Sequence, residues 1–258
     1  MISVIETNFN LHANMVPELT DGMHVHKSSN LTFVNSGLSC DTFNILHITN
    51  GSDIQKEELE QGINHYRNQN LDFCIWINDE NLTSKVSSYF IDLGISVQGE
   101  EIGMTLDLTK YETKSHPLHS NIQQVTSDEL LDSYSKVLAS NWTPADQNVI
   151  TYYQRTKDSF LDSSKGIILL IHHFDGVPVS TVELFPTDKK TIGIYGLATL
   201  ESYRGKGIGS SMMSYILNTA KSLGYETAIL QATEDGIGIY EKMGFVRHTK
   251  YYEFALKV

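Results

Sequence analysis

The stretch Leu197–Met213, LATLESYRGKGIGSSMM, joins a strand-like run to the start of a helical pattern. Its middle holds glycines at positions 205, 207 and 209, together with Arg204 and Lys206. Backbone N–H groups at a helix N-terminus are unpaired and carry partial positive charge, and glycine lets an anion approach them closely. The stretch therefore predicts a phosphate-binding loop between a strand and a helix. The competing interpretation is a tight turn with no ligand.

The spacing excludes two common phosphate-binding fingerprints. The P-loop, G-x-x-x-x-G-K-[ST], needs glycine at position 200, where Leu200 stands, and Ser or Thr after Lys206, where Gly207 stands. The dinucleotide fingerprint G-x-G-x-x-G matches Gly205 and Gly207 but meets Ser210 in place of its third glycine. Another nucleotide remains an open alternative for the loop.

The spacing that is present resembles that of a known enzyme family. Arg204-x-x-Gly207-x-Gly209, after the strand IYGLATL, resembles motif A of the GCN5-related N-acetyltransferases (GNAT), [QR]-x-x-G-x-[GA]. Downstream, LQATEDGIGIYEKMGF is similar to motif B of the same family, in the family's order and approximate spacing. The resemblance covers about residues 120–258. It implies the acyl-CoA N-acyltransferase fold and transfer of an acetyl group from acetyl-CoA to an amine.

Carried over by position, the resemblance also implies roles for individual residues. The backbone of Leu197, Ala198 and Thr199 would pair with the pantetheine amides of acetyl-CoA like an added strand. Tyr240 would protonate the departing thiolate, since a phenol with a pKa of about 10 can donate near neutrality. The backbone N–H groups of the loop would hold the pyrophosphate, and these belong to Arg204, Gly205, Lys206, Gly207, Ile208, Gly209 and Ser210.

The general base is less clearly marked. Glu183, on the strand STVELFP, is the strongest carboxylate candidate, and Tyr195 could line the acceptor site. His172 and His173 stand on one strand and must point to opposite faces, so packing is expected for both. The opening helices of this half carry three aromatic residues in the region that shapes acceptor pockets in the family. For all three we expect ordinary core packing: Trp142, Tyr152 and Tyr153.

Composition limits the classes of partner. A formal charge of −12 disfavours nucleic acid and is compatible with a small cationic acceptor such as a polyamine or aminoglycoside. Cys40 and Cys74 lack metal-ligand spacing and predict buried, reduced thiols in a cytoplasmic protein, and no metal constellation is expected. The N-terminus lacks the basic region of a signal peptide. The longest aliphatic run, Ile167–Ile171, predicts a buried strand and no membrane span.

The patterning predicts an α/β protein with a mixed sheet, in two domains. The polar stretch Thr109–Asn121 is the predicted linker, giving a smaller α/β domain at 1–115 and a catalytic GNAT domain at 116–258. Expected in the first domain are strands at 30–36, 42–49, 71–77 and 102–108, with helices at 52–70 and 82–94. Expected in the second are helices at 126–142, 144–161, 207–223 and 236–244, with strands at 166–174, 177–186, 191–200, 227–233 and 250–258. Thr126 or Ser127 can cap the helix at 126–142, Gly94 ends the helix at 82–94, and Asp175-Gly176 forms the turn before the strand at 177–186.

A short repeat relates the two halves. YFIDLGI, ending at Ile95, matches IYEKMGF, ending at Phe245, and a strand follows each. Where the second copy has Tyr240, the first has Phe90, which carries no hydroxyl, and the first half also lacks the glycine loop. The repeat predicts that the first half is a degenerate GNAT-like copy that binds no CoA. For the whole chain, the rival to an enzyme is a non-catalytic acyl-CoA-sensing or interaction module.

Overall fold

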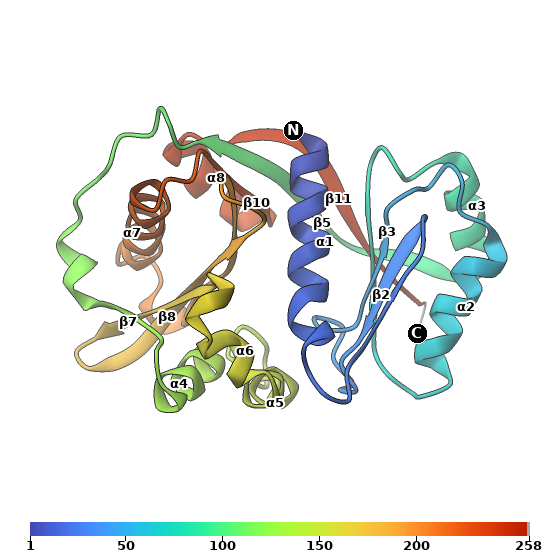
Figure 1. Ribbon diagram of the computed structural model, residues 1–258, viewed down its shortest axis with the longest axis horizontal. Coiled ribbons are helices and arrows are strands. Elements are labelled where there is room, and N and C mark those ends of the chain that lie inside the picture. The colour runs from blue at the N-terminus through green and yellow to red at the C-terminus, as the bar shows by residue number, and fades with distance from the viewer. Residues whose placement is uncertain (257–258) are drawn as a thin grey trace. The chain divides into compact units, whose positions relative to one another are not determined.

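The computed structural model describes residues 1–256, and the chain divides into two compact units (Figure 1). The first unit consists of Met1–Met104 with Gln231–Ile237 and Arg247–Val258, and the second consists of Thr105–Leu230 with Gly238–Val246. The boundary between residues 115 and 116 was predicted from the polar linker, whereas the compact units divide after Met104 and also exchange segments after residue 230. Residues 257 and 258, the end of the last predicted strand, lie outside the described residues.

The first unit is built on a mixed sheet with the order β1-β2-β3-β4-β11-β5. The first three strands form an antiparallel meander, β4 is parallel to β3, and β11 is antiparallel to β4. A core of aliphatic and aromatic side chains, among them Tyr66 and Phe90, packs around β2, β3 and β4. The strands span His24–Lys27 (β1), Leu31–Asn35 (β2), Ile45–Ile48 (β3), Cys74–Asn78 (β4), Ile95–Asp107 (β5) and Val246–Leu256 (β11).

Two of the three helices of this unit were predicted, α2 (Lys56–Arg67) and α3 (Ser84–Asp92). Thr83 caps α3 by accepting the Val86 N–H, and Gly94 beyond the helix end has a φ of +66°. A left-handed residue at this place terminates helices, as the sequence predicted. Cys40 and Cys74 are both buried, as the sequence predicted.

The sequence did not predict helix α1, Ile2–Glu18. It has no side-chain cap and contains three asparagines, which favour turns over helix interiors. Burial compensates, since Ile5, Phe9 and Val16 are at most 5% exposed. The short strand β1 was likewise missed, because its exposed residues give no apolar alternation.

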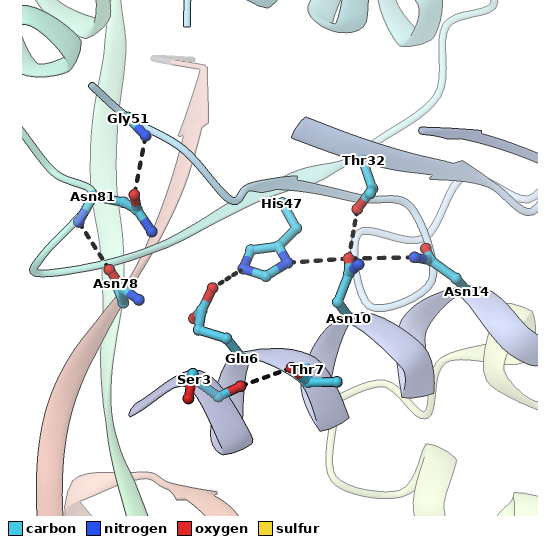
Figure 2. Close-up of polar contacts among 10 residues, drawn as sticks. All are labelled: Ser3, Glu6, Thr7, Asn10, Asn14, Thr32, His47, Gly51, Asn78 and Asn81. Atoms are coloured by element: carbon cyan, nitrogen blue, oxygen red, sulfur yellow. Dashed lines mark hydrogen bonds and ion pairs between the residues drawn. The ribbon is translucent and has the colours of Figure 1, made fainter. Parts of the chain in front are cut away.

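Polar contacts also fix α1 to the sheet of its own unit (Figure 2). The Glu6 carboxylate lies 3.1 Å from His47 Nε2, and His47 Nδ1 lies 3.2 Å from Asn10 Oδ1. The same Asn10 oxygen accepts hydrogen bonds from Thr32 Oγ1 at 2.7 Å and from Asn14 Nδ2 at 3.2 Å. Burial alone would raise the pKa of Glu6, but the hydrogen bond and charge of His47 lead the groups that lower it below its ordinary value. A buried polar network of this kind holds one helix face in one register.

The second unit has the sheet order β10-β9-β8-β7-β6, and the end of β5 borders β10. Strands β6 to β9 pair antiparallel, and β10 is parallel to β9. The predicted Asp175-Gly176 turn joins β7 to β8, with positive φ at both residues as a type I′ hairpin needs. The strands span Ile122–Gln124 (β6), Ile168–Phe174 (β7), Val177–Pro186 (β8), Thr191–Thr199 (β9) and Thr227–Ala232 (β10).

Helices pack on the sheet of the second unit. Ser127 caps α4 (Asp128–Ala139), as predicted, by accepting the Leu130 N–H at 3.4 Å. The single helix predicted at 144–161 is wrong, because the chain bends at Thr156 between α5 (Gln147–Arg155) and α6 (Lys157–Leu161). Helix α7 (Ile208–Ser222) ends before Gly224, which has a φ of +89°, and α8 spans Glu234–Met243.

The strand orders of the two halves agree, which supports the predicted repeat. In each half, three antiparallel strands, a helix, a parallel strand, a second helix and a final strand follow one another. The final strands are exchanged, however. Strand β11, which follows α8, is the neighbour of β4, while the end of β5, which follows α3, is the neighbour of β10.

Candidate active site

The edge of β9 that faces β10 is open along most of its length. Within the described part of the chain, β10 pairs with β9 only over Thr191–Gly193, although β9 continues to Thr199. The two strands are parallel and diverge beyond that point. Because unpaired strand edges bind extended amide-bearing chains, this edge is a candidate binding surface.

A bulge on the other side of β9 determines which groups face this edge. Thr181 pairs with Ala198 and Glu183 with Tyr195, so β9 has one residue more than β8 across this interval. Gly196, within the bulge, has a φ of +58°, and a Cβ there would lie 3.0 Å from the Tyr134 hydroxyl. Glycine is therefore required at this position.

Beyond the bulge the strand alternates regularly. The Ala198 carbonyl accepts the Ser180 hydroxyl at 2.6 Å, and the Leu200 N–H donates to the Val179 carbonyl at 2.9 Å, so both residues turn their backbone groups toward β8. Leu197 and Thr199 consequently direct theirs toward the open edge. Of the three residues predicted to pair with pantetheine, Leu197 and Thr199 therefore direct their backbone groups away from β8, although the Thr199 carbonyl already accepts a hydrogen bond from Arg204.

The glycine loop follows directly and leads into α7. Gly205 and Gly207 have φ values of +75° and +79°, and Gly207 is the N-cap. Of the described atoms, none lies within 4 Å of a Cβ built on Gly205 or Gly209. The first turn of α7, which is described in full, holds no acidic residue. The open space beside these glycines and the positive end of a 15-residue helix make this a candidate anion-binding surface.

The two cations of the loop are engaged elsewhere. Arg204 donates from Nε to the Thr199 carbonyl at 3.0 Å, which joins the loop to the end of β9. The Lys206 ammonium lies over the rings of Tyr203 and Phe174, at 4.7 and 5.2 Å from their centroids. The Arg204 N–H is also engaged, since it donates to the Glu201 carbonyl at 3.1 Å, so of the predicted pyrophosphate contacts those from Gly205 to Ser210 remain candidates. Ile208 is buried and anchors the first turn of α7.

Tyr240 lies on α8, half-buried, with its ring 5.9 Å from that of Phe245. The Phe245 N–H donates to the Tyr240 carbonyl at 3.1 Å, and this closes the end of the helix. Gly244 between them has a φ of +100°. The tyrosine, glycine and phenylalanine of the predicted motif thus form one local unit.

Glu183 lies within β8 and is 2% exposed. It is close enough to three tyrosines for its charge to act on them. Burial is the main cause that raises the pKa of Tyr134 and of Tyr152, and the charge of Glu183 raises both further. Burial also raises the pKa of Tyr153, and the charges of Tyr134 and Glu183 add to this effect. Because the pKa values of these three tyrosines are raised, their hydroxyl groups keep their protons at neutral pH beside the Glu183 side chain. The sequence indicated Glu183 but gave no sign that Tyr134 accompanies it, since Tyr134 fits the apolar face of an ordinary helix.

The other aromatic and histidine candidates are placed as follows. Tyr195 is half-buried opposite Glu183 on β9. His172 is 0% exposed and burial lowers its pKa, whereas His173 is half-buried, which is the predicted arrangement of one packed side chain on each face. The expectation of core packing is confirmed for Tyr152 and Tyr153 but is wrong for Trp142, which is 39% exposed after the end of α4.

The corresponding region of the first unit differs at each point. Strand β4 pairs with β3 from Ile45 to His47, so this edge is closed over nearly the whole of β3. Helix α2, in the position of α7, begins with Glu57 and Glu58 in its first turn, and carboxylates there repel an anion. Phe90, in the position of Tyr240, is 2% exposed and packs 4.5 Å from the Phe254 ring.

These features agree with what the chain resembles. The model of the acetyltransferase (GNAT) family matches residues 127–245, which include the open strand, the loop and Tyr240.

Residues 127–245 form a GNAT domain.

The chain is also similar to curated relatives and to solved structures. An uncharacterized N-acetyltransferase, CgeE, of Bacillus subtilis strain 168 is 37% identical over 98 residues, which are 34% of this chain and 38% of that protein. The chain spans less than two fifths of the length of the curated relatives that it matches. A GCN5-related N-acetyltransferase from Kribbella flavida has a TM-score of 0.69 at 14% identity, covering 96% of this chain and 94% of its own.

A tandem GNAT protein from the clavulanic acid biosynthesis pathway also matches, with a TM-score of 0.60 at 11% identity over 94% of this chain and 87% of its own. At such identities the two solved structures show a shared fold. The mixed α/β fold that the sequence predicts is thus confirmed. Among residues 1–256, no helix combines the length and apolar character needed to cross a bilayer.

Proposed function

We propose that the second unit binds acetyl-CoA and transfers its acetyl group to the amine of a small acceptor. The observation that carries the proposal is the open edge of β9, which ends at the anion-binding loop. Leu197 and Thr199 offer strand backbone to the pantetheine amides, and the loop offers N–H groups to the pyrophosphate. Amides and a diphosphate in this order are the chemistry of an acyl-CoA arm.

The proposed reaction is direct attack. The amine nitrogen forms a bond to the thioester carbonyl carbon, the carbon–sulfur bond breaks, and the thiolate receives the Tyr240 hydroxyl proton. The proton that leaves the amine passes to Glu183 through a water molecule, since Glu183 is 2% exposed. The neighbouring Tyr134 and Tyr153 hydroxyl groups stay protonated and can donate to the carboxylate.

The acceptor is proposed to be a small cationic amine. The formal charge of −12 attracts cations in general and repels acidic molecules. A screen of polyamines, aminoglycosides and amino-acid derivatives with acetyl-CoA tests this, with release of the CoA thiol as the first readout and a mass increase of the acceptor as the second. Acidic amines of similar size are the matched control. Thiol release with no acetylated amine would contradict amine transfer.

A second function is a module that binds acyl-CoA without turnover. The observation that favours the enzyme is the contrast between Tyr240 and Phe90, because only the second unit keeps a phenol at this position. Tight acetyl-CoA binding in calorimetry, with no thiol release across the whole panel, would favour the binding module.

We further propose that the first unit binds no CoA. Its paired β3–β4 edge and the acidic first turn of α2 support this. Calorimetric titration of the whole chain is expected to give one CoA per chain. Two bound CoA molecules per chain would refute the proposal. Leu197→Pro removes a backbone N–H from the β9 edge and is expected to weaken the binding of the single CoA.

A further inference from the structure

The side chain nearest to the start of the glycine loop comes from outside the motif. His116 precedes the short 3-10 helix Pro117–Asn121, far from the loop in sequence. A Cβ built on Gly207 would lie 3.8 Å from His116 Nε2 and 3.9 Å from its Cε1. The imidazole edge therefore lies against the N-cap of α7, at ordinary contact distance.

Hydrogen bonding fixes which ring nitrogen carries the proton. His116 Nδ1 accepts the Leu118 N–H at 3.2 Å and so caps the 3-10 helix. A neutral imidazole with Nδ1 as acceptor has its hydrogen on Nε2. The nitrogen beside Gly207 is thus a hydrogen-bond donor, at the same place where the loop N–H groups are exposed.

The segment that carries His116 is attached to α7 on both sides of it. Lys114 donates its N–H to Asn218 Oδ1 at 3.1 Å, and the Asn218 amide donates to the Lys114 carbonyl at 2.8 Å. On the other side, His119 Nε2 lies 2.8 Å from the Ser214 hydroxyl. The two hydrogen bonds between Lys114 and Asn218 fix the segment that carries His116 before any ligand arrives, which limits the entropy lost on binding.

The two cationic side chains of the loop make contacts elsewhere. Arg204 Nε donates to the Thr199 carbonyl, and the Lys206 ammonium rests on the Tyr203 and Phe174 rings. Both side chains are thus engaged in other contacts, whereas His116 Nε2 lies 3.8 Å from a Cβ built on Gly207.

We propose that His116 is a phosphate-binding residue of the acyl-CoA site, donating from Nε2 to a phosphate oxygen seated on the loop. The inference rests on the proposed function, since it assumes that the loop receives acyl-CoA. It assigns a binding contact to the linker, so the site extends beyond the residues matched by the GNAT family model.

Asparagine and glutamine substitutions separate the two roles of the ring. His116→Asn retains an acceptor near Nδ1 for the Leu118 N–H but lacks the distal donor, while His116→Gln places an amide donor near Nε2. His119→Asn is the matched control, because His119 belongs to the same segment but contacts Ser214. Thermal unfolding checks that all three variants remain folded.

The measurement is the Kd of each protein for acetyl-CoA, dephospho-CoA and S-acetylpantetheine, which carries no phosphate. His116→Asn is expected to weaken acetyl-CoA binding about tenfold, with partial recovery in His116→Gln and no change in His119→Asn or for S-acetylpantetheine. An equal loss for dephospho-CoA assigns the contact to the pyrophosphate, and a loss confined to acetyl-CoA assigns it to the 3′-phosphate.

Two results would overturn the proposal. Unchanged acetyl-CoA affinity in folded His116→Asn, with the wild type binding normally, refutes the His116 contact alone. An equal loss for S-acetylpantetheine refutes it as well, because the effect would then be structural. Absence of acetyl-CoA binding by the wild type refutes the proposed function together with this inference.

Discussion

Replacing Gly209 by alanine should change stability and ligand binding in opposite directions. Gly209 is the second residue of α7, and none of the described atoms lies within 4 Å of a Cβ built there. Its φ is not among the positive values of the chain, so alanine fits the backbone without strain. Alanine in a helix is more stable than glycine by about 0.5–1 kcal/mol, which raises the Tm by roughly 1–4 °C in a protein of this size.

The same methyl group should weaken acetyl-CoA binding. The empty space beside Gly209 is where a phosphate would approach the exposed N–H groups, and a methyl group there lengthens at least one of those hydrogen bonds. A hydrogen bond to a charged group contributes about 1.5–3 kcal/mol, so the Kd should rise about 10- to 100-fold. Differential scanning fluorimetry and calorimetric titration measure the two effects on one sample.

Two further glycines serve as comparisons. Gly238, on α8, also has no described atom within 4 Å of its Cβ position, so Gly238→Ala should raise the Tm and leave the Kd for acetyl-CoA unchanged. Gly207, with a φ of +79°, should lose about 1–2 kcal/mol of stability as alanine. A stabilised Gly209→Ala variant with unchanged acetyl-CoA affinity would refute the reasoning and leave the glycines as a simple turn.

Three other outcomes follow from the structure. Tyr240→Phe should lower kcat about 100-fold or more with little change in the Kd for acetyl-CoA, and unchanged turnover would remove Tyr240 from the mechanism. Glu183→Gln should lower kcat by at least tenfold near neutral pH and recover at high pH, where the amine is already deprotonated and needs no base, and a loss that persists at high pH would contradict the assignment of Glu183 as the base. Because interactions with His47 lower the pKa of Glu6, the stability that they contribute is present above about pH 4.5 and is lost as the pH falls below it. Glu6→Gln should therefore lower the free energy of unfolding by about 2 kcal/mol at pH 7. The fall of this free energy toward acid pH, measured by urea unfolding, should be less steep than in the wild type, and an equally steep fall would contradict the pairing.

The sequence predicted those parts of the site that depend on local patterns. The glycine loop, the caps at Ser127 and Gly94, and the Asp175-Gly176 turn each need particular residue types at fixed spacing, and the structure has them. Glycine spacing identified the loop but not the orientation of Lys206, because side-chain direction depends on rings distant in sequence, such as Phe174.

Features that depend on tertiary contacts were not predictable. Helix α1 has weak intrinsic propensity and is held by burial and by the contacts of Glu6 and Asn10 with the sheet, which leave no periodic signal. The approach of His116 to Gly207 joins segments with no shared pattern. The sequence pattern also could not predict the exchange of β5 and β11, since either final strand has the alternation needed to complete either sheet.

The exchanged strands have a consequence for how the protein is made. Strand β4 acquires its neighbour β11 through contacts such as Thr249 with Asp79, 170 positions apart. During synthesis, the edge of β4 that pairs with β11 therefore stays unpaired until nearly all of the second unit has been translated. Such an edge is a template for pairing with other chains, and late long-range closure slows folding. Expression of the first 115 residues alone is accordingly expected to give aggregates, and a chaperone that shields strand edges would raise the yield of the whole chain.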